Sequence, residues 1–297
     1  MTGSRQRTRR RPPRLLSGTT DLPVLLSPAE VLRAPIDGAP DFRLRGRHLA
    51  ALAVVFLLAA GVAEAQGGAA KEPVLATIAK WTPLMLRGFL FNLAISFMSM
   101  AIGTAVGAVL GIFQISLLPS VRAGSWVLTQ FFRNAPWLVL LFYMMFLLPF
   151  EIRLLGTTVP FPDWVKAVLG LALPVMANVS EIVRGAIQSI PSGQWESADS
   201  LAFNRRQTLW MIILPQCVKR MLPPWMNLYA ILTMATVLAS VVGVTEVMTL
   251  TGRVLSAENR PELLMPFYAY VLLWFFAYCY PIALWTIRME RRFAVNI

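Results

Sequence analysis

Few side chains in the long apolar stretches of this sequence are able to do chemistry. Glu181 and Arg184 stand three residues apart, on one face of a helix, close enough to form an ion pair. Ionisable groups inside an apolar helix are costly and usually face a cavity or a partner, so both are candidates for contact with a ligand. They also lie near the end of their apolar run, where a plain salt bridge explains them equally well.

Uncharged polar residues in such stretches form a second set of candidates. Asn178 and Ser180 lie in the same run as Glu181, and Thr236 and Ser240 stand one turn apart in a later run. Each is able to hydrogen-bond either a polar ligand or a neighbouring helix, and the second role is common in membranes. Both interpretations stay open.

Hydrolytic and metal chemistry find little support in the sequence. The one histidine, His48, stands beside an arginine cluster, so a histidine-based metal site or a Ser-His-Asp triad would lack its partners. Cys217 lies in a basic segment and Cys279 in an apolar run, so no disulfide between them is expected. Because the sequence has no Gly-Lys pair, it has no phosphate-binding P-loop, and any ATP and Mg²⁺ would be bound by another polypeptide.

The apolar stretches themselves indicate a membrane protein. Hydrophobic residues make up 57% of the 297 residues, against roughly 45–50% in soluble domains. Residues 88–121, 221–245 and 263–287 contain no Asp, Glu, Lys or Arg, and about 18 such residues already make a candidate membrane span. The expected fold class is therefore an all-α polytopic membrane protein.

Five spans are expected in the main part of the chain. They cover residues 84–115, 137–150, 164–184, 222–244 and 264–287. Arg122 is expected in a short loop, residues 151–163 in an exposed loop, and residues 186–220 in a polar loop. Small residues at every fourth position of the first span predict a close helix-packing seam: Ser99, Gly103, Gly107 and Gly111.

The net charge of +12 is concentrated towards the N-terminus. Residues 1–48 are basic and rich in proline and small polar residues, which predicts a disordered cytoplasmic tail near anionic lipid, with nucleic-acid binding as the less favoured reading. Residues 49–65 form a short apolar segment that is either an extra helix or signal-like and cleaved, and the start of translation also stays open. The excess of basic residues on the side of the tail places residues 186–220 and the C-terminus in the cytoplasm.

The polar loop contains an ordered motif. Glu196-Ser197-Ala198-Asp199-Ser200-Leu201-Ala202 is followed, after nine residues, by Ile212-Ile213-Leu214-Pro215. Ser180-Glu181-Ile182-Val183-Arg184-Gly185 and Phe132-Arg133-Asn134-Ala135-Pro136 stand upstream. In this order and spacing the set resembles the permease subunits of binding-protein-dependent ABC importers, in the branch that takes up polar amino acids. The resemblance covers most of the chain, about residues 84–292.

The resemblance implies a five-helix ABC type I importer core, residues 84–292, in the bacterial cytoplasmic (inner) membrane. Expected partners are ABC ATPase subunits that bind ATP and Mg²⁺, a second permease copy or paralogue, an extracytoplasmic solute-binding protein, an amino-acid substrate and the lipid bilayer, with no nucleic acid. Within the polar loop, a short helix along the membrane surface that ends in a sharp turn is expected to face the ATPase. The residues expected to couple to the ATPase are Glu196, Ser197, Ala198, Asp199, Leu201, Ala202, Phe203, Ile212, Leu214 and Pro215. The candidate substrate pathway comprises Asn134, Asn178, Ser180, Glu181, Arg184, Thr236 and Ser240.

Three residues depart from the pattern of the family. Ser197 and Ala202 replace an alanine and a glycine of the motif, and Met234 stands where many relatives carry a lysine. Glycine suits a sharp turn because it lacks Cβ. With Ala202 in its place, we expect that the turn avoids positive φ or that Asn204 adopts the left-handed conformation.

The apolar side chains of the same segment are candidate anchors for a partner, since such residues dominate interface energetics. They are Leu201, Phe203, Leu209 and Trp210. The alternative function is an ATP-independent carrier or channel, which would show internal repeats and charges in mid-span. An intramembrane enzyme would need a nucleophile and base at depth, and a transport-inactive subunit stays open.

Overall fold

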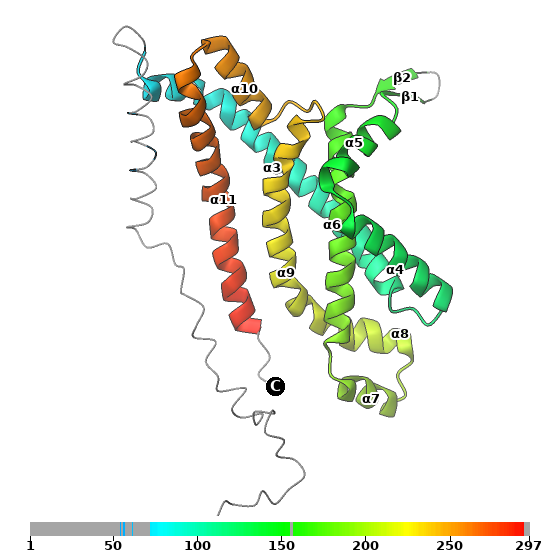
Figure 1. The fold of residues 1–297 in the computed structure, drawn as a ribbon. Coiled ribbons are helices and arrows are strands. Elements are labelled where there is room, and N and C mark those ends of the chain that lie inside the picture. Colours follow the sequence, from blue (N-terminus) through cyan, green and yellow to red (C-terminus); the bar gives the residue numbers. More distant parts are fainter. Residues whose placement is uncertain (1–53, 55, 57–60, 62–71, 155–156, 294–297) are drawn as a thin grey trace, which may run out of the picture. The chain divides into compact units, whose positions relative to one another are not determined.

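The computed structural model describes residues 54, 56, 61, 72–154 and 157–293. The basic tail (1–48) and nearly all of the apolar segment (49–65) lie outside this part. The described chain is helical apart from one short hairpin, so the expected all-α class is confirmed (Figure 1). Within it, four helical stretches are long and apolar enough to cross a membrane: Val74–Phe113, Asp163–Gln188, Arg205–Ser240 and Pro261–Arg292.

The first span is longer than the sequence predicted. Helix α3 runs over Val74–Phe113 and has 40 residues, about 60 Å at 1.5 Å per residue. It begins ten residues before the predicted start at Leu84, because Pro83 falls inside the helix without ending it. Such a length requires tilt or projection beyond the bilayer.

The predicted short loop around Arg122 is wrong, because these residues form helix α4, Pro119–Asn134. Pro119 occupies the first turn, where a missing N–H costs nothing. Ala135 is extended at ψ 137° before Pro136, as the residue before a proline prefers. Helix α5, Trp137–Leu147, then has only 11 residues, too few for a span that needs about 20. Helix α5 is therefore not among the four candidate spans of the described residues, and the predicted second span at residues 137–150 is not confirmed.

The predicted exposed loop at residues 151–163 contains an antiparallel hairpin instead. Strand β1 (Glu151–Leu154) pairs with β2 (Thr157–Pro160), and Glu151 lies opposite Pro160. Helix α6 follows over Asp163–Gln188 and extends four residues beyond the predicted end at Arg184.

Residues 186–220 contain the expected short helix and sharp turn, and they are more helical than the predicted polar loop. They comprise the end of α6, helix α7 (Ser192–Ser200), the short α8 (Arg205–Gln207), a π-helical turn (Thr208–Ile213) and the start of α9 (Leu214–Ala235). A 3₁₀ turn, Thr236–Ser240, ends that stretch. Helix α10 (Val247–Glu258) and a second 3₁₀ turn (Pro261–Leu263) precede α11 (Leu264–Phe293).

Two apolar clusters hold these helices together. The larger joins α3, α5, α6 and α9 around Leu171, Val175 and Leu232, which are fully buried. The smaller joins α3, α10 and α11 around Phe267 and Met85. Helix α3 belongs to both clusters, and Figure 1 shows it running behind the other long helices.

Candidate functional site

The motif segment, residues 192–215, forms a short helix, a tight turn and a second helical stretch. Helix α7 carries Glu196 and Asp199, both exposed, while Ala198 faces inward and is 1% exposed. Asn204 then caps α8, because its side chain accepts from the amide of Gln207 at 3.0 Å and the Gln207 side chain accepts from the Asn204 amide at 3.0 Å. This reciprocal capping box fixes where the second helical stretch begins.

Ala202 itself adopts the left-handed conformation, with φ 57°. The amide of Phe203 bonds to the carbonyl of Ala198 at 3.1 Å and the amide of Ala202 to that of Asp199 at 2.8 Å, which makes a Schellman turn at the end of α7. Both sequence expectations were therefore wrong, since the turn uses positive φ and Asn204 has φ −74°. An alanine in this conformation costs about 1–2 kcal/mol.

The apolar candidates in this segment divide into exposed and packed side chains. Leu201 is 71% and Trp210 58% exposed. Leu209 packs against the larger cluster, and Phe203 is half-buried. Leu209 therefore contributes to the fold and not to a surface for a partner. Met211, which the sequence analysis did not single out, is 64% exposed and belongs to the exposed apolar surface with Leu201 and Trp210. Among the motif's second half, Ile213 is buried, Ile212 and Leu214 pack on the cluster, and Pro215 is exposed.

Two arginines tie this segment to the long helices. The Arg205 guanidinium donates to the carbonyl of Ile115, just past α3, at 3.0 Å. The Arg220 Nη1 donates to the carbonyl of Ser189, at the end of α6, at 2.6 Å. The first bond connects the motif segment to the end of α3, and the second connects α9, which continues the motif segment, to the end of α6.

Three of the seven pathway candidates line one cavity. It has a volume of about 490 Å³, and Asn178, Glu181 and Arg184 meet Arg133 and Arg220 there. Glu181 lies 2.6 Å from Arg184 and 3.7 Å from Arg133. The predicted ion pair is present, and α4 and α9 each bring one more arginine to the cavity that sequence reasoning did not assign.

The other four candidates lie elsewhere. Ser180 accepts from Gln114 at 2.7 Å in a buried cluster of α3, α4 and α6, and the Asn134 side chain donates to the carbonyl of Gln130 at 2.7 Å. The hydroxyl of Ser240 donates to its own 3₁₀ turn, at the carbonyl of Val237, 2.7 Å away. These bonds are the helix-to-helix and local roles that the sequence left open.

Thr236 belongs to a buried polar network that sequence reasoning missed. Asn92 of α3 donates to Thr236 Oγ1 at 3.0 Å and to Glu246 Oε2 at 2.9 Å, and accepts from the amide of Val247 at 3.1 Å. Glu246 caps α10 by accepting from the amide of Thr249 at 2.9 Å. All three network side chains have no exposed surface. Asn92 could have indicated this network from the sequence, because it places an amide side chain inside an uncharged run.

The small residues of the first span face α6. The Ser99 hydroxyl donates to the carbonyl of Val168 at 3.0 Å. A Cβ on Gly107 would lie 2.5 Å from the carbonyl oxygen of Met176, and one on Gly111 2.7 Å from Val183 Cβ. At Gly103 it would lie 2.7 Å from Val175 Cβ. Larger side chains would therefore push the two helices apart.

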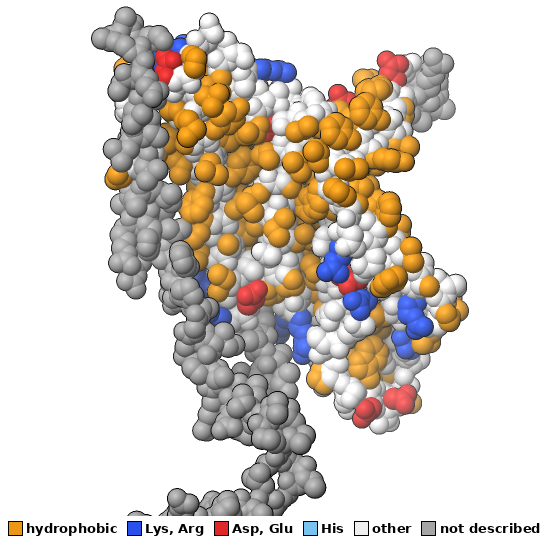
Figure 2. Space-filling view, in the orientation of Figure 1, with side chains coloured by type: hydrophobic (Ala, Val, Ile, Leu, Met, Phe, Trp, Pro, Cys, Tyr) orange, Lys and Arg blue, Asp and Glu red, His pale blue; other side chains and the backbone are white. Residues whose placement is uncertain are grey.

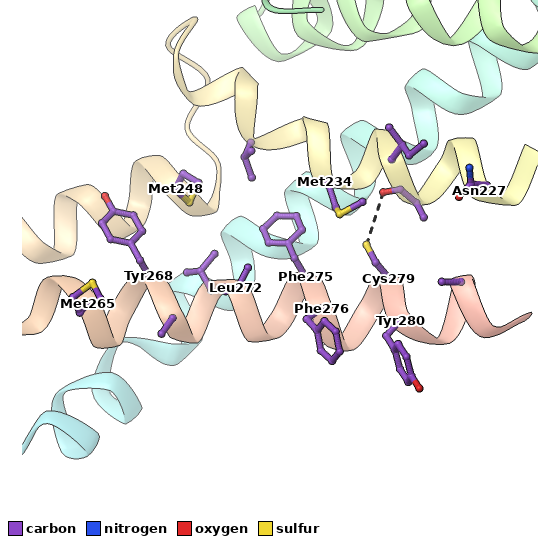
Figure 3. A pocket seen from close by; sticks show the side chains of 16 residues that line it. Asn227, Met234, Met248, Met265, Tyr268, Leu272, Phe275, Phe276, Cys279 and Tyr280 are labelled. Carbon is purple, nitrogen blue, oxygen red and sulfur yellow. Dashed lines mark hydrogen bonds between the residues drawn. The ribbon is translucent and has the colours of Figure 1, made fainter. Parts of the chain in front are cut away.

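Met234 lines a second, larger cavity between α9 and α11. This groove has a volume of about 830 Å³ and is walled by apolar side chains, among them Met248, Met265 and Phe275 (Figure 3). The thiol of Cys279 donates weakly to the carbonyl of Ala230 across it, at 3.9 Å. Position 234 thus contributes a methionine and not a lysine to this wall. Methionine and aromatic side chains form much of the surface that a ligand would contact.

Known proteins resemble this chain in sequence and in fold. The family described as "Binding-protein-dependent transport system inner membrane component" matches residues 103–284, more than half of the chain. The chain therefore belongs to this family, and it is an integral membrane permease.

A probable amino-acid ABC transporter permease protein of Bacillus subtilis, YckA, is 32% identical over 71% of this chain and 90% of its own length. A probable glutamine ABC transporter permease protein of the same organism, GlnP, is 30% identical over 69% of this chain and 91% of its own length. A crystal structure of an amino acid ABC transporter matches the fold with a TM-score of 0.60 over 73% of this chain and 99% of the other. Its sequence identity of 23% supports the fold alone.

Proposed function

We propose that this chain is the permease subunit of an ATP-driven importer for polar amino acids. A solute-binding protein would deliver the amino acid to the outer face of a permease dimer, and two ATPase subunits would bind the motif segments from the cytoplasm. Each permease would supply half of the pathway. The names of its relatives support the amino-acid class, and they differ in the amino acid: glutamine, L-cystine, arginine and glutamate.

The geometry of the motif segment supports this proposal most strongly. A helix that carries exposed Glu196 ends in a fixed turn, and Leu201 and Trp210 are exposed beside it. Exposed apolar anchors next to charged groups are typical of a docking site for a protein partner. Arg205 and Arg220 connect this surface to α3 and α6, so a displacement of the segment would move the long helices.

Alternating access follows from that connection. Closure of the ATPase subunits on ATP would draw the two motif segments together and rotate the attached helices, which opens the pathway to the inside. ATP and Mg²⁺ would be bound by the ATPase partner. This assignment places the motif segment and the C-terminus in the cytoplasm, in agreement with the excess of basic residues on that side.

The ATPase activity of the purified permease–ATPase complex in liposomes tests the proposal. Loaded binding protein should stimulate hydrolysis in the wild type, and Glu196→Lys should abolish the stimulation by reversing a charge at the docking surface. Glu290→Lys is the matched control, because Glu290 is equally exposed but lies near the end of α11. If hydrolysis ignores both the binding protein and Glu196→Lys, the ATP-independent carrier becomes the better account.

A further inference from the structure

The cavity between α4, α6 and α9 holds more positive charge than its own carboxylate neutralises. Arg133, Arg184 and Arg220 line it together with a single acidic residue, Glu181. Arg184 pairs closely with Glu181, at 2.6 Å, while Arg133 lies 3.7 Å from the same carboxylate. Three guanidinium groups against one carboxylate leave two positive charges in excess. Charges in a membrane protein are costly unless they meet an opposite charge or water.

Further hydrogen bonds hold Arg184 and Arg220 in place, and their acceptors are uncharged groups that do not neutralise them. Arg184 Nη1 donates to the amide oxygen of Gln188 at 2.9 Å, and Arg220 Nη1 donates to the hydroxyl of Ser189 at 2.9 Å. A guanidinium carries five N–H donors, so both keep donors for another acceptor. The Arg133 side chain is 46% exposed. The cavity is therefore a fixed set of donors that suits an anion.

The cavity lies where the apolar surface ends. Glu181 stands seven residues before the end of α6 at Gln188, about 10 Å along the helix. Trp126 and Phe131 of α4 are 52% and 63% exposed, as side chains that face lipid are. Figure 2 shows a broad band of apolar side chains, with Lys and Arg side chains gathered at and below its lower border. This is the level at which lipid headgroups meet a membrane protein.

We propose that this cavity binds the phosphate groups of an anionic phospholipid. Guanidinium groups bind phosphate oxygens in a bidentate manner, and basic pockets between membrane helices are suited to such headgroups. Two excess charges match a lipid with two phosphates, such as cardiolipin. A zwitterionic amino acid has no net charge and glutamate has a single negative charge, so either would leave at least part of the excess uncompensated. The inference needs the proposed function only to assign this end of the helices to the cytoplasmic leaflet.

Lipid binding to the full-length chain, purified in detergent and delipidated, tests the inference. Native mass spectrometry would compare cardiolipin, phosphatidylglycerol and phosphatidylcholine as added probes. The wild type should retain cardiolipin most strongly and phosphatidylcholine least. Arg133→Gln should weaken cardiolipin binding roughly tenfold, which is about 1.4 kcal/mol, because it removes a charge-assisted hydrogen-bond donor from the cavity. Arg133→Lys should retain part of the affinity, because it keeps the charge but loses the planar fork.

Arg122→Gln is the matched control, because Arg122 is an exposed arginine of the same helix that does not line the cavity. It should bind cardiolipin like the wild type. Thermal unfolding without lipid checks that Arg133→Gln folds, and Arg220→Gln is the second variant if it does not.

Three results would overturn the inference. The first is equal retention of phosphatidylcholine and cardiolipin by the wild type, or equal binding by Arg133→Gln and Arg122→Gln. The second is binding of inorganic phosphate that competes fully with cardiolipin, which would make this a site for a free anion. The third is unchanged cardiolipin binding by Arg133→Gln together with loss of amino-acid uptake, which would place the cavity on the substrate pathway. Failure of the importer proposal would show separately, as absent ATPase stimulation in the wild type.

Discussion

At the scale of single residues, Ala202 carries the most unusual backbone of the motif segment. Its φ of 57° is one of two positive values outside glycine among the described residues, the other being that of Asn259. The bonds of Phe203 and Ala202 to the end of α7 require this conformation. The fold therefore accepts local strain at Ala202, where the resemblance to the family motif led us to expect glycine.

Ala202→Gly should stabilise the protein by about 1 kcal/mol. Removal of the Cβ relieves the left-handed strain, and the greater freedom of glycine in the unfolded chain offsets part of the gain. Ala198→Gly is the control within the same helix and should destabilise by about 1 kcal/mol, since its backbone is helical. Thermal unfolding in detergent measures both, and an Ala202→Gly variant that unfolds below the wild type would contradict the role of this turn.

Glu246 adds a second prediction at this scale, about pH. Burial raises the pKa of its carboxyl above the ordinary value of 4.5, against hydrogen bonds from Met248, Asn92 and Thr249 that lower it. The folded state thus holds the proton more tightly than the unfolded state does. This stabilising contribution is complete below about pH 4.5 and is lost as the pH rises through the folded-state pKa.

Unfolding of the wild type and of Glu246→Gln across that range checks the sign. The wild type should lose stability relative to the variant as the pH rises, because the variant has no carboxyl to ionise at this site. If the wild type instead became more stable relative to the variant as the pH rises, the hydrogen bonds would lower the pKa of Glu246 by more than burial raises it.

At the scale of elements, the packing of α3 on α6 depends on side chains that are small. Gly107→Ala should destabilise by about 1–3 kcal/mol, the usual cost of overpacking, because its Cβ would lie 2.5 Å from the Met176 carbonyl. Gly124→Ala, in α4 with open space around it, should be neutral or slightly stabilising, since alanine favours helix. If the two variants unfold alike, α3 and α6 do not pack as closely as described.

The elements show which parts of the fold were predictable from the sequence. Uncharged runs gave the existence of the long helices, because a span requires apolar side chains whatever its neighbours. They missed α4, whose Arg122 interrupts the apolar pattern. In residues 186–220 the family resemblance predicted one short helix but not the helical stretches that follow it. The start of α3 was also missed, since Pro83 indicates a break that the helix does not make.

The site was predictable where residues are close in the chain. Glu181 and Arg184 share one helix face, so their spacing sufficed. Arg133 and Arg220 reach the same cavity from α4 and α9, and Asn92 meets Glu246 from 154 residues away. Such contacts depend on how the helices pack against one another, and the spacing of residues within one segment does not predict that packing.

At the scale of the whole molecule, the motif segment lies at one end of the described chain, beyond the long helices (Figure 1). Arg205 and Arg220 link the two. The large groove between α9 and α11 is apolar, with Met234 in its wall, so a lysine does not contribute to recognition there. Under the proposed function, this chain moves substrate and leaves ATP hydrolysis to its partner.

Uptake of labelled amino acids into proteoliposomes tests that account most directly. The permease complex is reconstituted with ATP and Mg²⁺ inside and binding protein outside, and glutamine, cystine, arginine and glutamate are offered separately. The account predicts accumulation of at least one of them, lost when ATP, the ATPase subunit or the binding protein is omitted. Accumulation that continues without ATP and the ATPase subunit would contradict it and would establish a carrier that works alone.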